Sequence, residues 1–150
     1  MTLLIDADEL VFAGTAAVQQ DFKFNEYQHV LVSDERDAEE YIAAKLEEYQ
    51  SITGDRGKII MCFSDYPTFR HGIYSEYKAN RIGTRKPLAY KNVVEAMKRY
   101  YEYAIYPNLE ADDVMGILGS EEKHTTRVIV SADKDMKTIP CILLRNGELE

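Results

Sequence analysis

Three runs of apolar residues in this chain each lead to an acidic residue, and this pattern constrains the fold more than any other feature. They are TLLI before Asp6, KIIMCF before Asp65 and RVIVS before Asp133. Continuous apolar runs, as opposed to alternating ones, are typical of strands buried on both faces of a parallel sheet. Because the carboxyl ends of parallel strands meet at one edge of a sheet, these acids are expected to lie together.

Segments with helical spacing separate the strands, so the pattern predicts an α/β fold with a mostly parallel central sheet of about five strands flanked by helices. The expected helices cover about 9–18, the segment SDERDAEEYIAAKLEEYQ capped by Ser33 or Asp34, a helix opened by Pro87, and EADDVMGILG with Val114, Ile117 and Leu118 inward. The further expected strands are YQHVLV (27–32), in a hairpin with DFKF, AIY (104–106) and CILLR (141–145).

Composition limits the class of protein. A chain of 150 residues with 45% hydrophobic content can bury one core, so residues 1–150 are taken as a single domain. No apolar run is long enough to span a membrane, and MTLLIDADEL lacks the features of a signal peptide. Cys62 and Cys141 lie in apolar stretches and are interpreted as reduced core thiols of a cytoplasmic protein.

Acidic residues gather at four strand ends. Like charges at close range raise one another's pKa, and hard divalent cations with oxygen ligands relieve this repulsion. Two such ions suit phosphodiester hydrolysis. Any one of these acids alone is explained as a helix cap or a solvated strand end, but the whole set favours a metal site. For Asp8 a capping role and a metal-binding role both stay open. The set is Asp6, Asp65, Glu110, Asp112, Asp113, Asp133 and Asp135.

Positive charge is concentrated in one window. The net charge is −8, yet residues 70–100 hold eight Lys or Arg against two acids, a balance of +6 that leaves −14 elsewhere. Residues 66–86 are rich in Tyr, Arg and Gly without an apolar period, as expected of an exposed segment. Such a basic patch can guide a polyanion, although a solvated charged face explains it equally well.

Five motifs in order along the chain point to one family. They are LLIDADELVF, FSDYPTFR, YKANR, LEADDVMG and VSADKDMKTIP. With them the chain resembles the metal-dependent 5′-nucleases of the flap endonuclease class, within the PIN-like superfamily, and most of all the 5′→3′ exonucleases of tailed bacteriophages. The resemblance implies a parallel sheet flanked by helices, Mg²⁺ or Mn²⁺ held by the seven acids, and work in the host cytoplasm.

The basic segment acquires a role through the same resemblance. Residues 66–86 correspond to the family's arch, which single-stranded DNA threads, and Lys78 and Arg81 match catalytic positions that face the scissile phosphate. On the residues alone, Lys78 and Arg81 would be interpreted as a surface pair. Stacking on bases or contact with the DNA backbone is expected of Arg70, Tyr74, Tyr77, Arg85 and Lys86.

One departure from the family concerns the end of the chain. Family members continue past the VSADKD motif into a helix–hairpin–helix-type region that grips duplex DNA and adds aspartates to a second metal site. This sequence stops at RNGELE. Three explanations are open: a fragment, half of a split enzyme whose partner polypeptide supplies the rest, or a small member with a reduced site. The second of two ions is therefore expected to have an incomplete site.

The leading hypothesis is hydrolysis of DNA phosphodiesters from a 5′ end or at a 5′ flap, with RNA left open as a substrate in a PIN-type ribonuclease. One alternative is an aspartyl-phosphate phosphatase, with Asp6 as nucleophile and Asp8 as acid/base. Leu10 argues against it, because a small polar or β-branched residue is favoured there. A second alternative is a non-catalytic, partner-dependent DNA-binding subunit, which an exposed apolar patch near Ile142–Leu144 would support.

Overall fold

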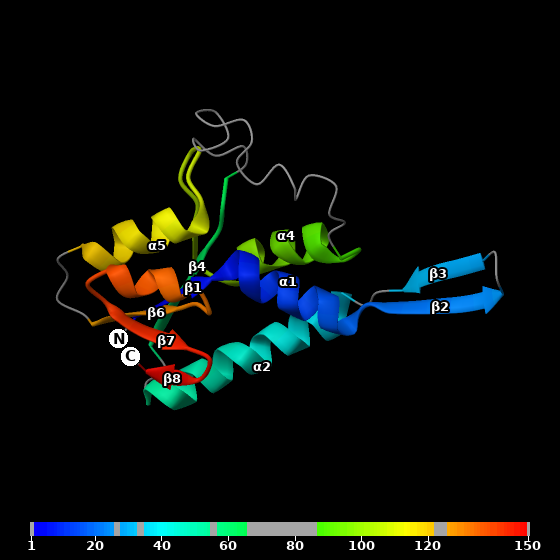
Figure 1. Cartoon of the computed structure of the whole chain (residues 1–150), viewed down its shortest axis with the longest axis horizontal. Helices are drawn as coiled ribbons and strands as arrows, with labels where there is room; N and C mark the ends of the chain where they lie inside the picture. Colours follow the sequence, from blue (N-terminus) through cyan, green and yellow to red (C-terminus); the bar gives the residue numbers. More distant parts are fainter. Residues whose placement is uncertain are drawn as a thin grey trace.

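A computed structural model of the chain describes residues 2–25, 28–32, 35–54, 57–65, 87–121 and 126–149. Within these residues the central sheet has six strands in the order β5-β4-β1-β6-β7-β8, and only β7 and β8 pair in antiparallel fashion (Figure 1). The strands are β1 (Thr2–Asp6), β4 (Lys58–Cys62), β5 (Tyr103–Ala104), β6 (Arg127–Val130), β7 (Ile142–Arg145) and β8 (Glu148–Leu149). The predicted α/β architecture is confirmed.

Helices cover both faces of this sheet. On one face, α1 (Ala7–Val18), α2 (Glu35–Thr53) and α4 (Tyr90–Tyr100) pack over inward-pointing side chains such as Leu3. On the other, α5 (Ala111–Ser120) and the 3₁₀ helix η2 (Lys134–Thr138) pack over Leu4 and its neighbours. Because strand side chains alternate between faces, β1 contributes to both cores, which explains its continuous apolar sequence.

Residues 20–32 form a separate two-stranded sheet. Its strands β2 (Gln20–Asn25) and β3 (Gln28–Val32) pair in antiparallel fashion, as the sequence predicted. Figure 1 shows this hairpin projecting away from the central sheet beyond the end of α1. None of the helices in the described part of the chain is long and apolar enough to cross a membrane.

Three local predictions were wrong in detail. Helix α4 begins at Tyr90, after a turn in which the Tyr90 amide donates to the Pro87 carbonyl at 3.0 Å, so Pro87 does not open the helix itself. Ile117 is 44% exposed, because the inward face of α5 follows the i, i+3, i+4 rule from Ala111 through Val114 and Met115. The strand expected at 104–106 covers 103–104. The helix cap expected at Ser33 or Asp34 lies outside the described residues.

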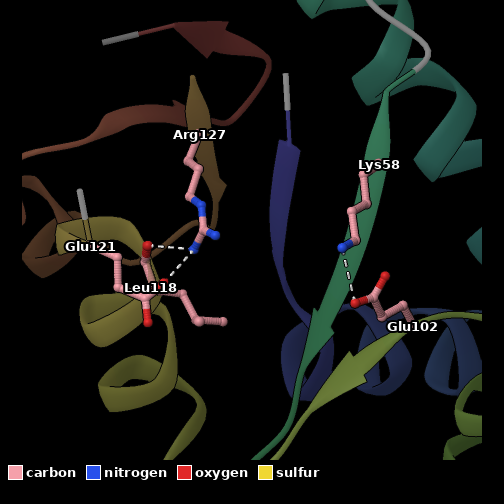
Figure 2. Close-up of polar contacts among 5 residues, drawn as sticks. All are labelled: Lys58, Glu102, Leu118, Glu121 and Arg127. Carbon is pink, nitrogen blue, oxygen red and sulfur yellow. Dashed lines mark hydrogen bonds and ion pairs between the residues drawn. The ribbon is translucent and has the colours of Figure 1, made fainter. Parts of the chain in front are cut away.

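Basic residues begin two strands at the amino edge of the sheet (Figure 2). Arg127 at the start of β6 donates to the Leu118 carbonyl at 2.7 Å and pairs with Glu121 at 3.4 Å, which ties the sheet to the carboxyl end of α5. Lys58 at the start of β4 pairs with Glu102 at 3.1 Å, an exposed contact of little energetic weight. These cations serve the fold, and the strand-end acids lie at the opposite edge.

Both cysteines are free thiols. Cys62 in β4 is fully buried, and burial raises the pKa of its thiol to about 12, so the group stays protonated at neutral pH. Cys141 is half-buried just before β7. The prediction of unpaired thiols is confirmed for both residues, and full burial holds for Cys62.

Candidate active site at the carboxyl edge of the sheet

Asp6 is the buried centre of this edge. It ends the central strand β1, is only 8% exposed and caps α1 by accepting from the Glu9 amide at 3.4 Å. The Ser131 hydroxyl donates to its Oδ2 at 2.9 Å. Burial, followed by the charges of Glu9, Asp112 and Asp8, raises the pKa of Asp6 from 3.8 to about 7. Acids from α1 and α5 therefore act on one buried carboxyl group.

Helix α5 brings Asp112 to this group in its first turn. Glu110 precedes the helix as its N-cap, and the Asp113 Oδ2 accepts from the Glu110 amide at 3.2 Å in a reciprocal capping box. Glu110 and Asp113 thus shape the start of the helix. The amino end of the helix dipole favours negative charge at Asp112, and the charge of Asp112 acts on Asp6.

The end of β4 connects α1 to α5. The Ser64 amide donates to the Asp8 carboxylate at 3.2 Å, and the Ser64 hydroxyl accepts from the Ala111 amide at 2.9 Å. Asp8 therefore anchors β4, while the cap of α1 is Asp6. Asp65 follows, and its Oδ2 accepts from the Asn108 amide at 2.9 Å, where Asn108 has a φ of 62°. The Asp65 carboxylate holds that turn in place.

A loop after β6 carries the last two predicted acids. The Asp133 amide donates to the Ser131 hydroxyl at 3.1 Å, so Ser131 links Asp133 to Asp6. The Asp133 Oδ1 accepts from the Asp135 amide at 2.9 Å and caps η2, whereas Asp135 is exposed. Ser131 is buried and was not predicted as a site residue.

Glu9 is the second residue that sequence reasoning missed. Its two carboxylate oxygens accept from the Ala132 amide at 3.1 and 3.3 Å, which fastens the loop after β6 to α1. Burial, and after it the charge of Asp133, raises the pKa of Glu9. The spacing Asp6-x-x-Glu9 matches a capping box, and this was the sequence signal that could have singled out Glu9. In the structure the Glu9 side chain bonds to the loop after β6 and not to the backbone at the start of α1.

We expect Glu9→Ala to weaken divalent-ion binding about tenfold, because the loop that carries Asp133 loses its attachment to α1. Glu9→Gln keeps an oxygen for the Ala132 amide and should bind ions within about threefold of wild type. Titration calorimetry with Mn²⁺ measures both. Equal affinities for Glu9→Ala and wild type would contradict this role.

The structure thus sorts the candidate acids into three groups. Asp6 and Asp112 interact through their charges, with Asp8 and Asp133 attached beside them, while Asp65, Glu110 and Asp113 hold local backbone turns and Asp135 faces solvent. Among the described residues, no group of three or more Asp, Glu, His or Cys side chains is arranged so that it could hold a metal ion. The oxygen donors fit a hard ion such as Mg²⁺, which keeps several waters and needs only one or two carboxylates.

The predicted cationic and aromatic residues of the arch lie outside the described part of the chain. Their contact with the acidic edge therefore stays a prediction. They are Arg70, Tyr74, Tyr77, Lys78, Arg81, Arg85 and Lys86.

The sequence of this chain is similar to those of known proteins. Residues 1–140 match a protein-family model, which is described as the 5′-3′ exonuclease, N-terminal resolvase-like domain. An exodeoxyribonuclease of Enterobacteria phage T3 is 34% identical over 150 residues, which cover 92% of this chain and 48% of that protein. An exonuclease of Escherichia phage T7 is 32% identical over 146 residues, covering 92% and 49%. The chain spans about half the length of these relatives.

A solved structure shares the fold. The T5 5′-exonuclease with bound zinc superposes with a TM-score of 0.56 at 14% sequence identity, over 100% of this chain and 57% of that one. At this identity the likeness supports the architecture described above and carries no residue roles.

Proposed function

The chain belongs to the 5′-3′ exonuclease family, and on that premise we propose that it carries the catalytic centre of a metal-dependent nuclease that hydrolyses DNA from a 5′ end or at a 5′ flap in the host cytoplasm. The observation that carries the proposal is Asp6. A buried carboxyl group whose pKa is raised to about 7 by burial and neighbouring acids lowers the stability of the fold as the pH rises from 3.8 to about 7. A bound cation would compensate the charge of this buried group, which explains why an acid is placed there.

Asp6 and Asp112 are the residues that would hold a divalent ion, Mg²⁺ or Mn²⁺, with Asp8 and Asp133 beside them. When bound, such an ion makes a water molecule acidic enough to attack at neutral pH and neutralises charge on the phosphate. The zinc bound to the T5 5′-exonuclease supports a divalent ion here. Ser131 orients Asp6 through its hydroxyl, and the amino end of α5 stabilises negative charge. We propose two ions, as the family resemblance implies.

Cations of the arch complete the proposal. Lys78 and Arg81 would stabilise charge on the scissile phosphate. The remaining predicted arch residues would contact the DNA strand. DNA is the proposed substrate because one relative is named an exodeoxyribonuclease. RNA cleavage and a second polypeptide stay predictions.

The alternatives receive less support. Family membership favours a nuclease over an aspartyl-phosphate phosphatase, and the Asp8 carboxylate accepts from the Ser64 amide. The apolar patch that would favour a non-catalytic subunit is not found in the described residues at 142–144: Leu143 and Leu144 are 2% and 1% exposed, and Ile142 alone is 41% exposed.

A cleavage assay tests the proposal. Wild type, Asp112→Asn and the exposed control Glu47→Gln are compared on 5′-flap duplex, blunt duplex, single-stranded DNA and RNA, in Mg²⁺, Mn²⁺ and EDTA. We expect metal-dependent DNA cleavage that Asp112→Asn lowers by more than about 100-fold and Glu47→Gln leaves unchanged. No cleavage by folded wild type in either metal, or full activity of Asp112→Asn, would contradict the proposal.

A further inference from the structure

A cavity of about 320 Å³ opens beside Asp6, between α1, α2 and the turn that joins β7 to β8. Asp6 and Glu9 line its end at the acidic edge. Tyr41, Lys45 and Tyr49 of α2 line the opposite wall. Asp6 therefore belongs both to the proposed metal site and to this cavity.

We propose that the cavity is a subsite for the nucleoside of the terminal nucleotide that the enzyme removes. The inference rests on the proposed function: a scissile phosphate held at Asp6 brings the adjoining nucleoside to the cavity. Its volume lies at the lower end of the range for small-molecule pockets, which starts at about 300 Å³. A pocket of this size next to Asp6 favours removal of single nucleotides over cutting far from an end.

The lining suits a base in preference to a phosphate. Tyr41 and Tyr49 are half-buried and carry aromatic rings, on which any base can stack without sequence preference. Three acids, Asp6, Glu9 and Glu48, face the cavity against one cation, Lys45, which already pairs with Glu48 at 3.3 Å. This balance repels a phosphate and accepts an uncharged nucleoside.

Two alanines of α1 give a matched pair of variants. Ala13 is exposed and lines the cavity, so Ala13→Phe would occupy it. Ala16 is exposed on the same helix and is not part of the lining, so Ala16→Phe controls for the added ring. Exposed helix positions tolerate this change at small energetic cost. Tyr41→Leu separately removes one aromatic face.

Saturation-transfer NMR with deoxyadenosine and thymidine, in EDTA, reads the subsite without metal or catalysis. We expect both nucleosides to bind wild type and Ala16→Phe equally, and Ala13→Phe and Tyr41→Leu to bind them about tenfold more weakly. Inorganic phosphate should not displace them. Failure of wild type to bind either nucleoside, unchanged binding by Ala13→Phe, or displacement by phosphate would overturn the subsite.

Cleavage kinetics separate this inference from the proposed function. If the subsite is correct, Ala13→Phe raises the KM for a 5′-end substrate about tenfold relative to Ala16→Phe. An enzyme that cuts DNA with the same KM in both variants contradicts the subsite and leaves the nuclease proposal intact. A wild type that binds nucleosides in EDTA yet cuts no DNA in any metal contradicts the nuclease proposal and leaves the cavity as a nucleoside-binding site only.

Discussion

Asp6→Asn is expected to abolish DNA cleavage while making the metal-free protein more stable above pH 7. Asparagine keeps an oxygen that can accept from the Glu9 amide and cap α1, and its amide nitrogen can donate to the Ser131 hydroxyl in place of Oδ2, so the local structure should survive. It removes the charge that a divalent ion would bind. Outer partners of metal ligands typically contribute 10- to 100-fold, so loss of a ligand should lower cleavage by more than about 100-fold.

The stabilising half of this prediction follows from the pKa of Asp6. A rise from 3.8 to about 7 means that the folded state disfavours the ionised group by about 4 kcal/mol at pH 8. The asparagine variant escapes this penalty, and its Tm should rise by roughly 10 °C. Calorimetry in EDTA measures it, with Glu47→Gln as the control. A variant less stable than wild type at pH 8 would contradict the account.

Divalent ions are expected to stabilise the wild type at pH 8 and to have little effect at pH 5. The pKa of Asp6 is raised in the folded protein, so its favourable contribution is complete below 3.8 and disappears as the pH rises through about 7. The metal-free wild type therefore loses stability relative to Asp6→Asn between about pH 4 and pH 7. An ion that binds the charged form restores about 2–3 kcal/mol at a hundredfold excess over its Kd.

Thermal unfolding of wild type and Asp6→Asn across this pH range, with MgCl₂ or EDTA, tests that linkage. NaCl at matched ionic strength controls for screening of the acidic surface. The metal-induced rise in Tm should be present for wild type at pH 8 and lost both at pH 5 and in Asp6→Asn. A rise of equal size at both pH values, or in the variant, would show that the ion binds elsewhere.

Much of the fold could be predicted because burial on both faces leaves a plain mark on a strand. β1, β4 and β6 are continuous apolar runs, and their order of pairing brings their carboxyl ends together. β8 was not predicted, although its signal was present. Asn146-Gly147 adopts φ values of 53° and 83°, and an Asn-Gly pair is a strong hairpin signal. A strand of only two residues has no periodicity to detect.

The sequence predicted which acids lie at the site, but it did not predict which hydrogen bonds they make. Strand ends indicated where acids would gather, but the backbone groups that each carboxylate accepts from depend on loop conformation. Asp65 is directed to the Asn108 amide by a turn with positive φ. Glu9 reaches Ala132, which is 123 residues away along the chain. No local pattern encodes such contacts: the spacing Asp6-x-x-Glu9 indicates only a capping box, and Ser131 emerges only from the folded chain.

Binding of Mn²⁺ to wild type and to Asp6→Asn at pH 8, followed by titration calorimetry, probes the acidic edge as a metal centre without substrate or turnover. We expect saturable binding to wild type, and binding weakened by more than about tenfold in Asp6→Asn with the fold intact. Equal binding by the two proteins, or none by the wild type, would contradict the assignment of this acidic edge as a metal centre.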